Sequence, residues 1–141
     1  MFFGSFFHSL DDKGRLVIPR KMREELGTKA YVMKGYDGAL SIYKNEAFEQ
    51  VMAQSATLPF EKKDARAYLR VQLATVSELD VDKSGRVQIP TQLLNQYHIG
   101  KDVIVLGVFD HIEVWDKEKY EEYIKSMDEN FEDIAEKLKG E

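Results

Sequence analysis

The chain of 141 residues contains no cysteine, which excludes disulfide bridges and thiolate metal sites. It also lacks an apolar run of the roughly 18 to 20 residues needed to cross a bilayer. The apolar start, MFFGSFFHSL, has neither the basic leading segment nor the small-residue cleavage site of a signal peptide. These absences predict a soluble, cytoplasmic protein. The length suits one compact domain with an ordinary hydrophobic core.

Motifs of common catalytic sites are missing as well. The sequence contains no G-x-S-x-G, no P-loop and no G-x-G-x-x-G, so it offers no local signature of a nucleophile elbow or a nucleotide site. The three histidines, His8, His98 and His111, do not have the spacing of metal ligands. We therefore expect no catalytic residue, no metal, no cofactor and no small-molecule substrate.

Charge is distributed unevenly. The net charge is −5, but residues 113–141 hold 11 acidic residues against 5 lysines, which leaves residues 1–112 at +1. Within that part, five basic residues lie close together: Lys13, Arg15, Arg20, Lys21 and Arg23. A locally basic surface on an acidic protein is the pattern expected of a chain that binds a polyanion through one face.

One ten-residue phrase occurs twice. LDDKGRLVIP at positions 10–19 returns as VDKSGRVQIP at positions 81–90, with an acid, a glycine, an arginine, an isoleucine and a proline in register. A repeat that served packing alone would retain mainly apolar positions. The retained Asp-x-x-x-Arg pair and glycine indicate a duplicated functional motif.

The segments after each phrase also correspond. A short helix beginning near Pro19 or Pro90 is followed by a hairpin, with its turn at Asp37-Gly38 in the first copy and Asp110-His111 in the second. A helix follows each hairpin, capped by Asn45 or Asp116, and a further helix capped by Asp64 and an extended TVSELDV segment lie between the copies. The last helix has an apolar stripe at helical spacing: Tyr120, Tyr123, Ile124, Met127, Phe131, Ile134 and Leu138.

This order predicts an α+β fold of two β repeats with peripheral helices. We divide the chain into residues 1–60 and residues 61–141. Each half has too few strands to be stable alone, so we expect the halves to pair about a pseudo-twofold axis into one compact unit.

The repeated residues suggest how this motif functions. Gly14 and Gly85 permit a sharp turn, beside which Arg15 and Arg86 emerge. The acid four residues earlier, Asp11 or Asp82, can hold the guanidinium of its own copy or that of the other copy. With Lys13 and Lys83 nearby, two oriented arginines can neutralise phosphates and present a bidentate fork to guanine in the major groove of double-stranded DNA.

Three other interpretations compete with this one. Each Asp-Arg pair alone is compatible with an exposed salt bridge that merely stabilises a turn. Asp11 and Asp82 could form a hydrolytic carboxylate dyad, but Lys83 beside Asp82 opposes the sharing of a proton. The C-terminal apolar stripe is compatible with a protein that only assembles or binds a protein partner.

The two phrases identify a family resemblance. MFFGSFFHSLDDKGRLVIPRKMREELG resembles the start of the MraZ family, and VSELDVDKSGRVQIP resembles its second copy. The resemblance implies bacterial, nucleoid-associated transcriptional regulators built from two AbrB-like swapped-hairpin repeats in a pseudo-twofold small barrel. It also implies a ring-shaped homo-oligomer that binds direct repeats in the promoter of a cell-division and cell-wall gene cluster containing its own gene, as a repressor.

The resemblance also assigns residues to DNA binding. Arg15 and Arg86 would take the major part, with orienting roles for Asp11 and Asp82. The remaining DNA-binding residues would be Lys13, Gly14, Arg20, Arg23, Lys83 and Gly85. Residues 91–96 carry no positive charge where the first copy has its basic cluster, which weakens the expectation that the two copies contact DNA equally.

Overall fold

Strands and helices follow one another in nearly the same order in the two halves of the chain. The computed structural model describes residues 1–140. The first half contains β1 (Ser5–Ser9), β2 (Arg15–Val17), α1 (Arg20–Leu26), β3 (Lys29–Lys34), β4 (Leu40–Lys44) and α2 (Asn45–Ser55). The second half contains α3 (Lys63–Thr75), β5 (Ser77–Asp80), β6 (Arg86–Gln88), α4 (Thr91–Gln96), β7 (Asp102–Val108), β8 (His111–Asp116), α5 (Lys117–Glu129) and α6 (Phe131–Lys139). The predicted α+β class is confirmed.

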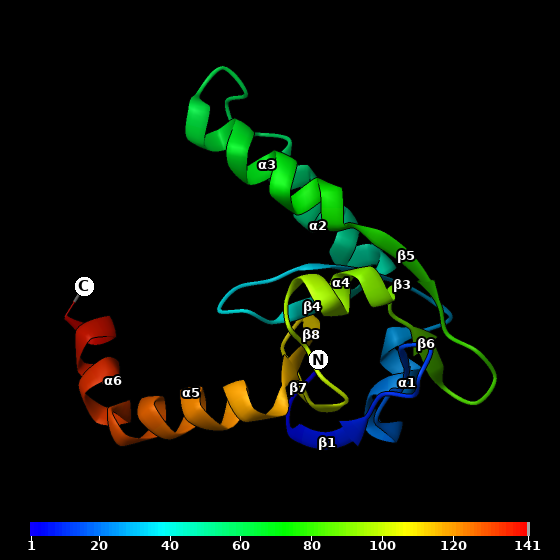
Figure 1. The fold of residues 1–141 in the computed structure, drawn as a ribbon. Coiled ribbons are helices and arrows are strands. Elements are labelled where there is room, and N and C mark those ends of the chain that lie inside the picture. Colours follow the sequence, from blue (N-terminus) through cyan, green and yellow to red (C-terminus); the bar gives the residue numbers. More distant parts are fainter. Residues whose placement is uncertain (141) are drawn as a thin grey trace.

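The strands of the two halves are interleaved (Figure 1). A six-stranded antiparallel sheet has the order β1-β7-β8-β4-β3-β5, and β2 pairs with β6 in a separate two-stranded ribbon. Each half thus donates its first strand to the hairpin of the other half: β1 to β7 and β5 to β3. The expected closed barrel is not found in the described residues, because β1 and β5 remain as sheet edges and the ribbon pairs only with itself.

The repeated phrase supplies part of the core. Leu16, Ile18, Val87 and Ile89 are almost completely buried and belong to one apolar cluster with strand residues such as Ile42 and Val105. Burial of each such side chain contributes about 1.5–3 kcal/mol to folding. These residues fix the ribbon against the body and leave the alternate positions of β2 and β6 directed outward.

The two hairpin turns differ from each other. Asp37 and Gly38 have φ of 59° and 87°, as the predicted Asp-Gly turn requires. The second turn was placed wrongly at Asp110-His111, because Val108 pairs with His111 and leaves Phe109 and Asp110 as its two central residues. Phe109 has φ of 59° and is held by two backbone hydrogen bonds with Phe2, of 2.8 and 2.9 Å.

Two helical arms extend from the body, α2–α3 and α5–α6, whereas β2, β6 and α1 lie on the right of Figure 1, away from the tips of both arms. The single C-terminal helix of the prediction is broken at Asn130, whose Nδ2 donates to the carbonyl of Ser126 at 2.8 Å. No helix among residues 1–140 is long and apolar enough to cross a membrane.

The expected helix caps also differ in detail. Asn45 is the first residue of α2 and bonds weakly to Glu49, and Asp64 lies in the first turn of α3. Asp116 does precede α5, but its Oδ1 accepts a hydrogen bond from the amide of Gly100. None of the three side chains therefore makes the predicted capping hydrogen bond.

Candidate nucleic-acid interface

The first copy of the repeated phrase forms a tight turn that we call the first corner, residues 11–15. Oδ1 of Asp11 accepts hydrogen bonds from the amides of Lys13 and Arg15, both at 2.9 Å. Its Oδ2 accepts from Nε of Arg15 at 2.6 Å. Gly14, with φ of 79°, donates its amide to the carbonyl of Asp11 at 3.0 Å. The carboxylate thus fixes both the turn and the direction of the guanidinium.

The second corner, residues 82–86, repeats this geometry bond for bond. Oδ1 of Asp82 accepts from the amides of Ser84 and Arg86 at 2.9 Å, and Oδ2 accepts from Nε of Arg86 at 3.0 Å. Gly85 has φ of 78°. The sequence allowed each acid to hold the arginine of either copy. The structure shows that each acid holds the arginine of its own copy.

The arginines remain available for a ligand. Their side chains are 36% and 39% exposed, and among residues 1–140 hydrogen bonds form only at Nε. Both terminal nitrogens of each guanidinium are consequently free for a bidentate contact. A salt bridge this exposed adds little to stability, so its main physical effect is to restrict the orientation of the arginine.

Both corner carboxylates are held in the ionised form. The backbone amide of Arg15, together with its guanidinium, lowers the pKa of Asp11, and Arg86 does the same to the pKa of Asp82. A proton-sharing dyad requires one carboxyl with a raised pKa. The geometry therefore argues against the hydrolase interpretation.

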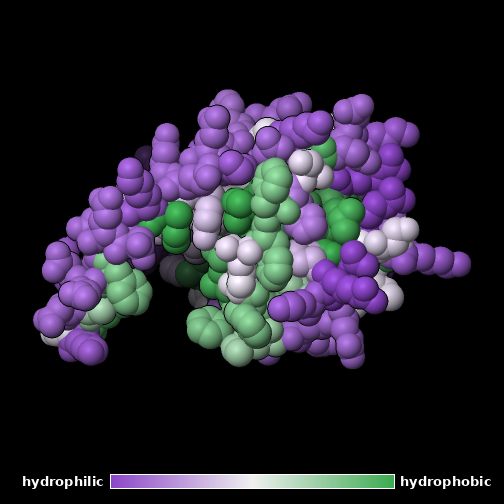
Figure 2. Space-filling view, turned by 90° about the horizontal axis from the view of Figure 1, so that it is seen from below, coloured by the Kyte–Doolittle hydropathy of each residue, from purple (hydrophilic) through white to green (hydrophobic). Residues whose placement is uncertain are grey.

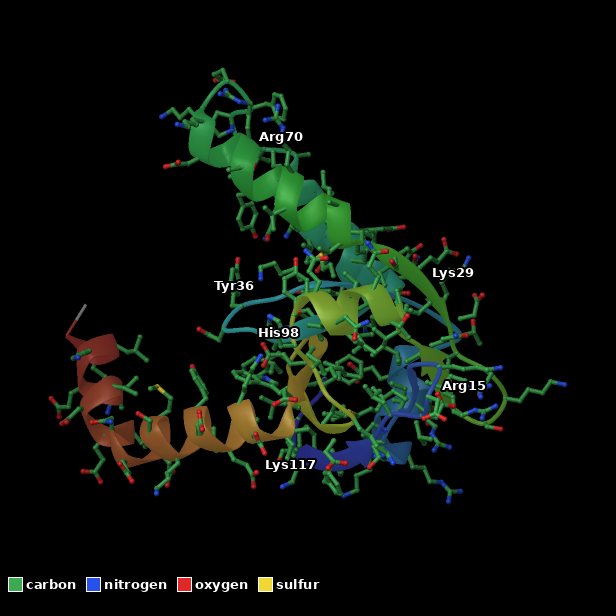
Figure 3. All side chains as sticks on the ribbon, viewed as in Figure 1. Arg15, Lys29, Tyr36, Arg70, His98 and Lys117 are labelled. Carbon is green, nitrogen blue, oxygen red and sulfur yellow. The ribbon has the colours of Figure 1, made fainter. Side chains whose placement is uncertain are left out.

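The β2–β6 ribbon joins the two corners and holds one at each of its ends. Leu16 faces Val87 on the buried side of the ribbon. The amide of Ile18 donates to the carbonyl of Gly85 at 2.8 Å, and the amide of Ile89 donates to the carbonyl of Gly14 at 2.9 Å. These reciprocal bonds relate the corners by a local pseudo-twofold axis. Figure 3 shows Arg15 at the ribbon, far from Arg70 on α3.

Helix α1 lies against the second corner, not against the corner that precedes it in sequence. Nε of Arg23 donates to the carbonyl of Ile18 at 2.9 Å, and the guanidinium of Arg23 fills the space over Gly85. Arg23 and Glu24 line a shallow hollow with Asp82, Lys83 and Gly85. The corresponding neighbours of Gly14 come from α4 and are Thr91 and Leu94.

This exchange changes the expected distribution of charge. Arg23 of α1 belongs to the second corner, and the absence of positive charge in residues 91–96 concerns the first corner. Lys13, Arg20 and Lys83 are exposed, whereas Arg23 is half-buried. Their contacts with DNA stay predictions.

Sequence reasoning did not single out two outward-facing ribbon residues, Val17 and Gln88. Val17 lies opposite Arg86, and Gln88 lies opposite Arg15 and donates Nε2 to the carbonyl of Lys13 at 3.1 Å. The alternation of buried and exposed positions in R-L-V and R-V-Q was the signal that could have found them. Among residues 1–140, no group of three or more His, Asp and Glu is arranged to hold a metal ion.

Comparison with known proteins agrees with this duplicated architecture. The family model described as "MraZ protein, putative antitoxin-like" matches residues 1–71 and 73–141. Three proteins named "Transcriptional regulator MraZ" are 47%, 42% and 37% identical to this chain over 138 residues: those of Caldanaerobacter subterraneus subsp. tengcongensis, Lactiplantibacillus plantarum and Moorella thermoacetica. The alignments cover 98% of this chain and 96–98% of the relatives. Since the matches run through both corners and nearly the whole length, the chain belongs to the MraZ family.

Proposed function

We propose that this protein is a transcriptional regulator that binds double-stranded DNA in a sequence-specific manner. The observation that carries the proposal is the ribbon with two equivalent guanidinium groups, each fixed by its own carboxylate and free at both terminal nitrogens. The names of the relatives support the same function. Binding at a promoter represses transcription by excluding the polymerase, and the protein is not an enzyme.

The ribbon is the reading element. The major groove of B-DNA admits a two-stranded β-ribbon, and an arginine fork pairs with O6 and N7 of guanine. Arg15 and Arg86 make these contacts, and Asp11 and Asp82 orient them. Lys13, Arg20 and Lys83 neutralise phosphates, and Arg23 uses the terminal nitrogens that its bond to Ile18 leaves free.

Self-association supplies the affinity that one ribbon lacks. Figure 2 shows apolar side chains gathered both on the body and along the α5–α6 arm at the left. On that arm, Tyr123, Ile124, Phe131 and Leu138 are between 37% and 73% exposed. Helices as short as α5 and α6 are marginal in water without a packing partner. A second copy of the chain covers this apolar face, and repetition of the contact closes a ring.

A ring presents several ribbons to one duplex. Once one DNA repeat is bound, the next ribbon engages at a high effective concentration, so tandem repeats are preferred without new contacts. We further propose that the halves, residues 1–60 and 61–141, are AbrB-like repeats. The target is the promoter of a cell-division and cell-wall cluster that includes the protein's own gene, which places the protein in the cytoplasm on the nucleoid.

The direct test is a gel-shift titration with the DNA immediately upstream of the protein's own gene. A scrambled duplex of the same length and composition serves as the control, and the salt concentration is held constant because phosphate contacts are salt-dependent. Specific binding predicts retardation of the upstream fragment at a concentration at least tenfold lower than for the control. Equal retardation of both fragments would favour the second candidate, a protein that only assembles through its apolar arm.

A further inference from the structure

Four side chains form the outer face of the β2–β6 ribbon. Residues 15 and 17 of β2 and residues 86 and 88 of β6 point away from the buried Leu16–Val87 pair. Arg15 lies opposite Gln88, and Val17 lies opposite Arg86. Neighbouring strands are about 4.8 Å apart and alternate residues of one strand about 6.6 Å apart. With a base-pair rise of about 3.4 Å, the Cα atoms of this face span about two base-pair steps.

The face is symmetric at two positions and asymmetric at the other two. The pseudo-twofold axis that exchanges the corners exchanges Arg15 with Arg86, which are identical. It also exchanges Val17 with Gln88, which differ: one is an apolar, branched side chain and the other a primary amide. A ribbon with equal residues at both positions would read a DNA element and its reverse complement equally well.

The structure prepares Gln88 for a directional contact. Its Nε2 donates to the carbonyl of Lys13 at 3.1 Å, which restricts the amide while leaving Oε1 and the second N–H of Nε2 for another partner. An amide with one donor and one acceptor free matches N7 and the N6 amino group of adenine. Val17 is 36% exposed and offers only methyl groups, which suit the methyl group of thymine.

We propose that Val17 and Gln88 give the ribbon a direction on DNA, with Gln88 reading an adenine and Val17 contacting a thymine methyl beside the bases read by the two arginines. This inference rests on the proposed DNA-binding function. It explains how a nearly symmetric reading head distinguishes the two strands. A chain that binds direct repeats needs this distinction, because all its copies must face the same way along the duplex.

The test uses two duplexes. The first is the element recovered from random DNA by selection with the wild-type protein. The second keeps the guanines that the two arginines read and exchanges the base pairs read by Gln88 and Val17. The wild type should prefer the first duplex by about tenfold, the discrimination expected of one bidentate amide contact. The double variant Val17→Gln/Gln88→Val should prefer the second duplex.

The single variants make the test sharper. Gln88→Val and Val17→Gln each give a symmetric face and should bind the two duplexes equally. Gln92→Val changes an exposed glutamine of α4 outside the ribbon and should keep the wild-type preference. Circular dichroism and gel filtration check that each variant is folded.

The outcomes distinguish a failure of the proposed DNA-binding function from a failure of the directional role of Gln88. If the wild type binds neither duplex better than a scrambled one, the DNA-binding function itself is wrong. If the wild type binds specifically and Gln88→Val keeps its preference for the first duplex, DNA binding stands and the directional role of Gln88 is overturned.

Discussion

The guanidinium of Arg23 covers Gly85, so the helix that follows the first motif closes over the corner of the second motif. Nε of Arg23 also bonds to the carbonyl of Ile18, whose amide bonds to the carbonyl of Gly85. The two motifs are therefore physically dependent on each other. A change in either copy is expected to affect the geometry of both.

Removal of a corner arginine should weaken specific DNA binding while leaving the fold intact. Arg15→Ala and Arg86→Ala each remove one fork and should weaken binding by about 1–3 kcal/mol, with relaxed specificity at the guanine concerned. Gel-shift titration at constant salt measures the loss. Arg70→Ala removes an exposed arginine of α3 and is the matched control. Unchanged binding by both corner variants would leave assembly as the only supported role.

Affinity should depend steeply on the number of DNA repeats. Duplexes with one, two and three repeats offer sites to successive ribbons of the proposed ring, so the apparent dissociation constant should fall at each step. Insertion of half a helical turn between repeats moves the next site to the opposite side of the duplex and should cancel the gain. A titration that gives the same constant for all of these duplexes would remove avidity from the mechanism.

Three glycine substitutions should rank in a fixed order of stability loss. Gly38→Ala meets only the strain of its positive φ, about 1–2 kcal/mol, because nothing lies within 4 Å of the new Cβ. Gly14→Ala adds a contact of 2.5 Å with the backbone carbonyl of Ile89, which cannot move freely. Gly85→Ala meets the side chain of Arg23, which can. We expect Gly14→Ala to cost most, Gly85→Ala less and Gly38→Ala least.

Urea denaturation measures this order directly, as the change in the free energy of unfolding. The same strain is present at all three positions, since φ is 79°, 78° and 87°. Equal losses in the three variants would show that crowding at the corners adds nothing to the strain.

Acidification should loosen the corners only at low pH. The folded state lowers the pKa of Asp11 and of Asp82 below 3.8, so the folded chain binds these protons more weakly than the unfolded chain does. Their contribution to stability is fully present above the unfolded pKa and is lost as the pH falls through the lower folded pKa. Carbon NMR of the two carboxyl groups should show midpoints below 3.8. Midpoints at or above that value would contradict the corner geometry.

If the α5–α6 arm forms the proposed contact between copies, a charge on its apolar face should weaken that contact. Phe131→Glu introduces a carboxylate at a side chain that is 67% exposed in the single chain and should reduce both the oligomer mass and the helix content. Light scattering and far-ultraviolet circular dichroism measure the two effects. Glu132→Gln, next to it in the same helix, is the control. An unchanged mass for Phe131→Glu would place the contact between copies elsewhere.

Local features of the fold were readable from the sequence. Asp37-Gly38 predicts its turn because both residues tolerate positive φ. The spacing of Asp11, Gly14 and Arg15 predicts the first corner because all its bonds lie within five residues.

Features that depend on distant residues were not readable. The turn at Phe109 is held by Phe2, and α1 packs on the corner of the other copy because strands are exchanged between the halves. The break at Asn130 was hidden because the apolar periodicity continues across it, from Met127 to Phe131 and Ile134. Local patterns fix elements, whereas long-range pairing decides which elements meet.

The pairing of β2 with β6 also determines when the two-stranded ribbon can form during synthesis. When β2 leaves the ribosome its partner strand has not yet been translated, and at about 5–20 residues per second the gap of 71 positions lasts roughly 4 to 14 s. During this interval the nascent chain contains the first corner arginine but not the second. Only chains in which both strands have been synthesised can hold the two corner arginines on one ribbon.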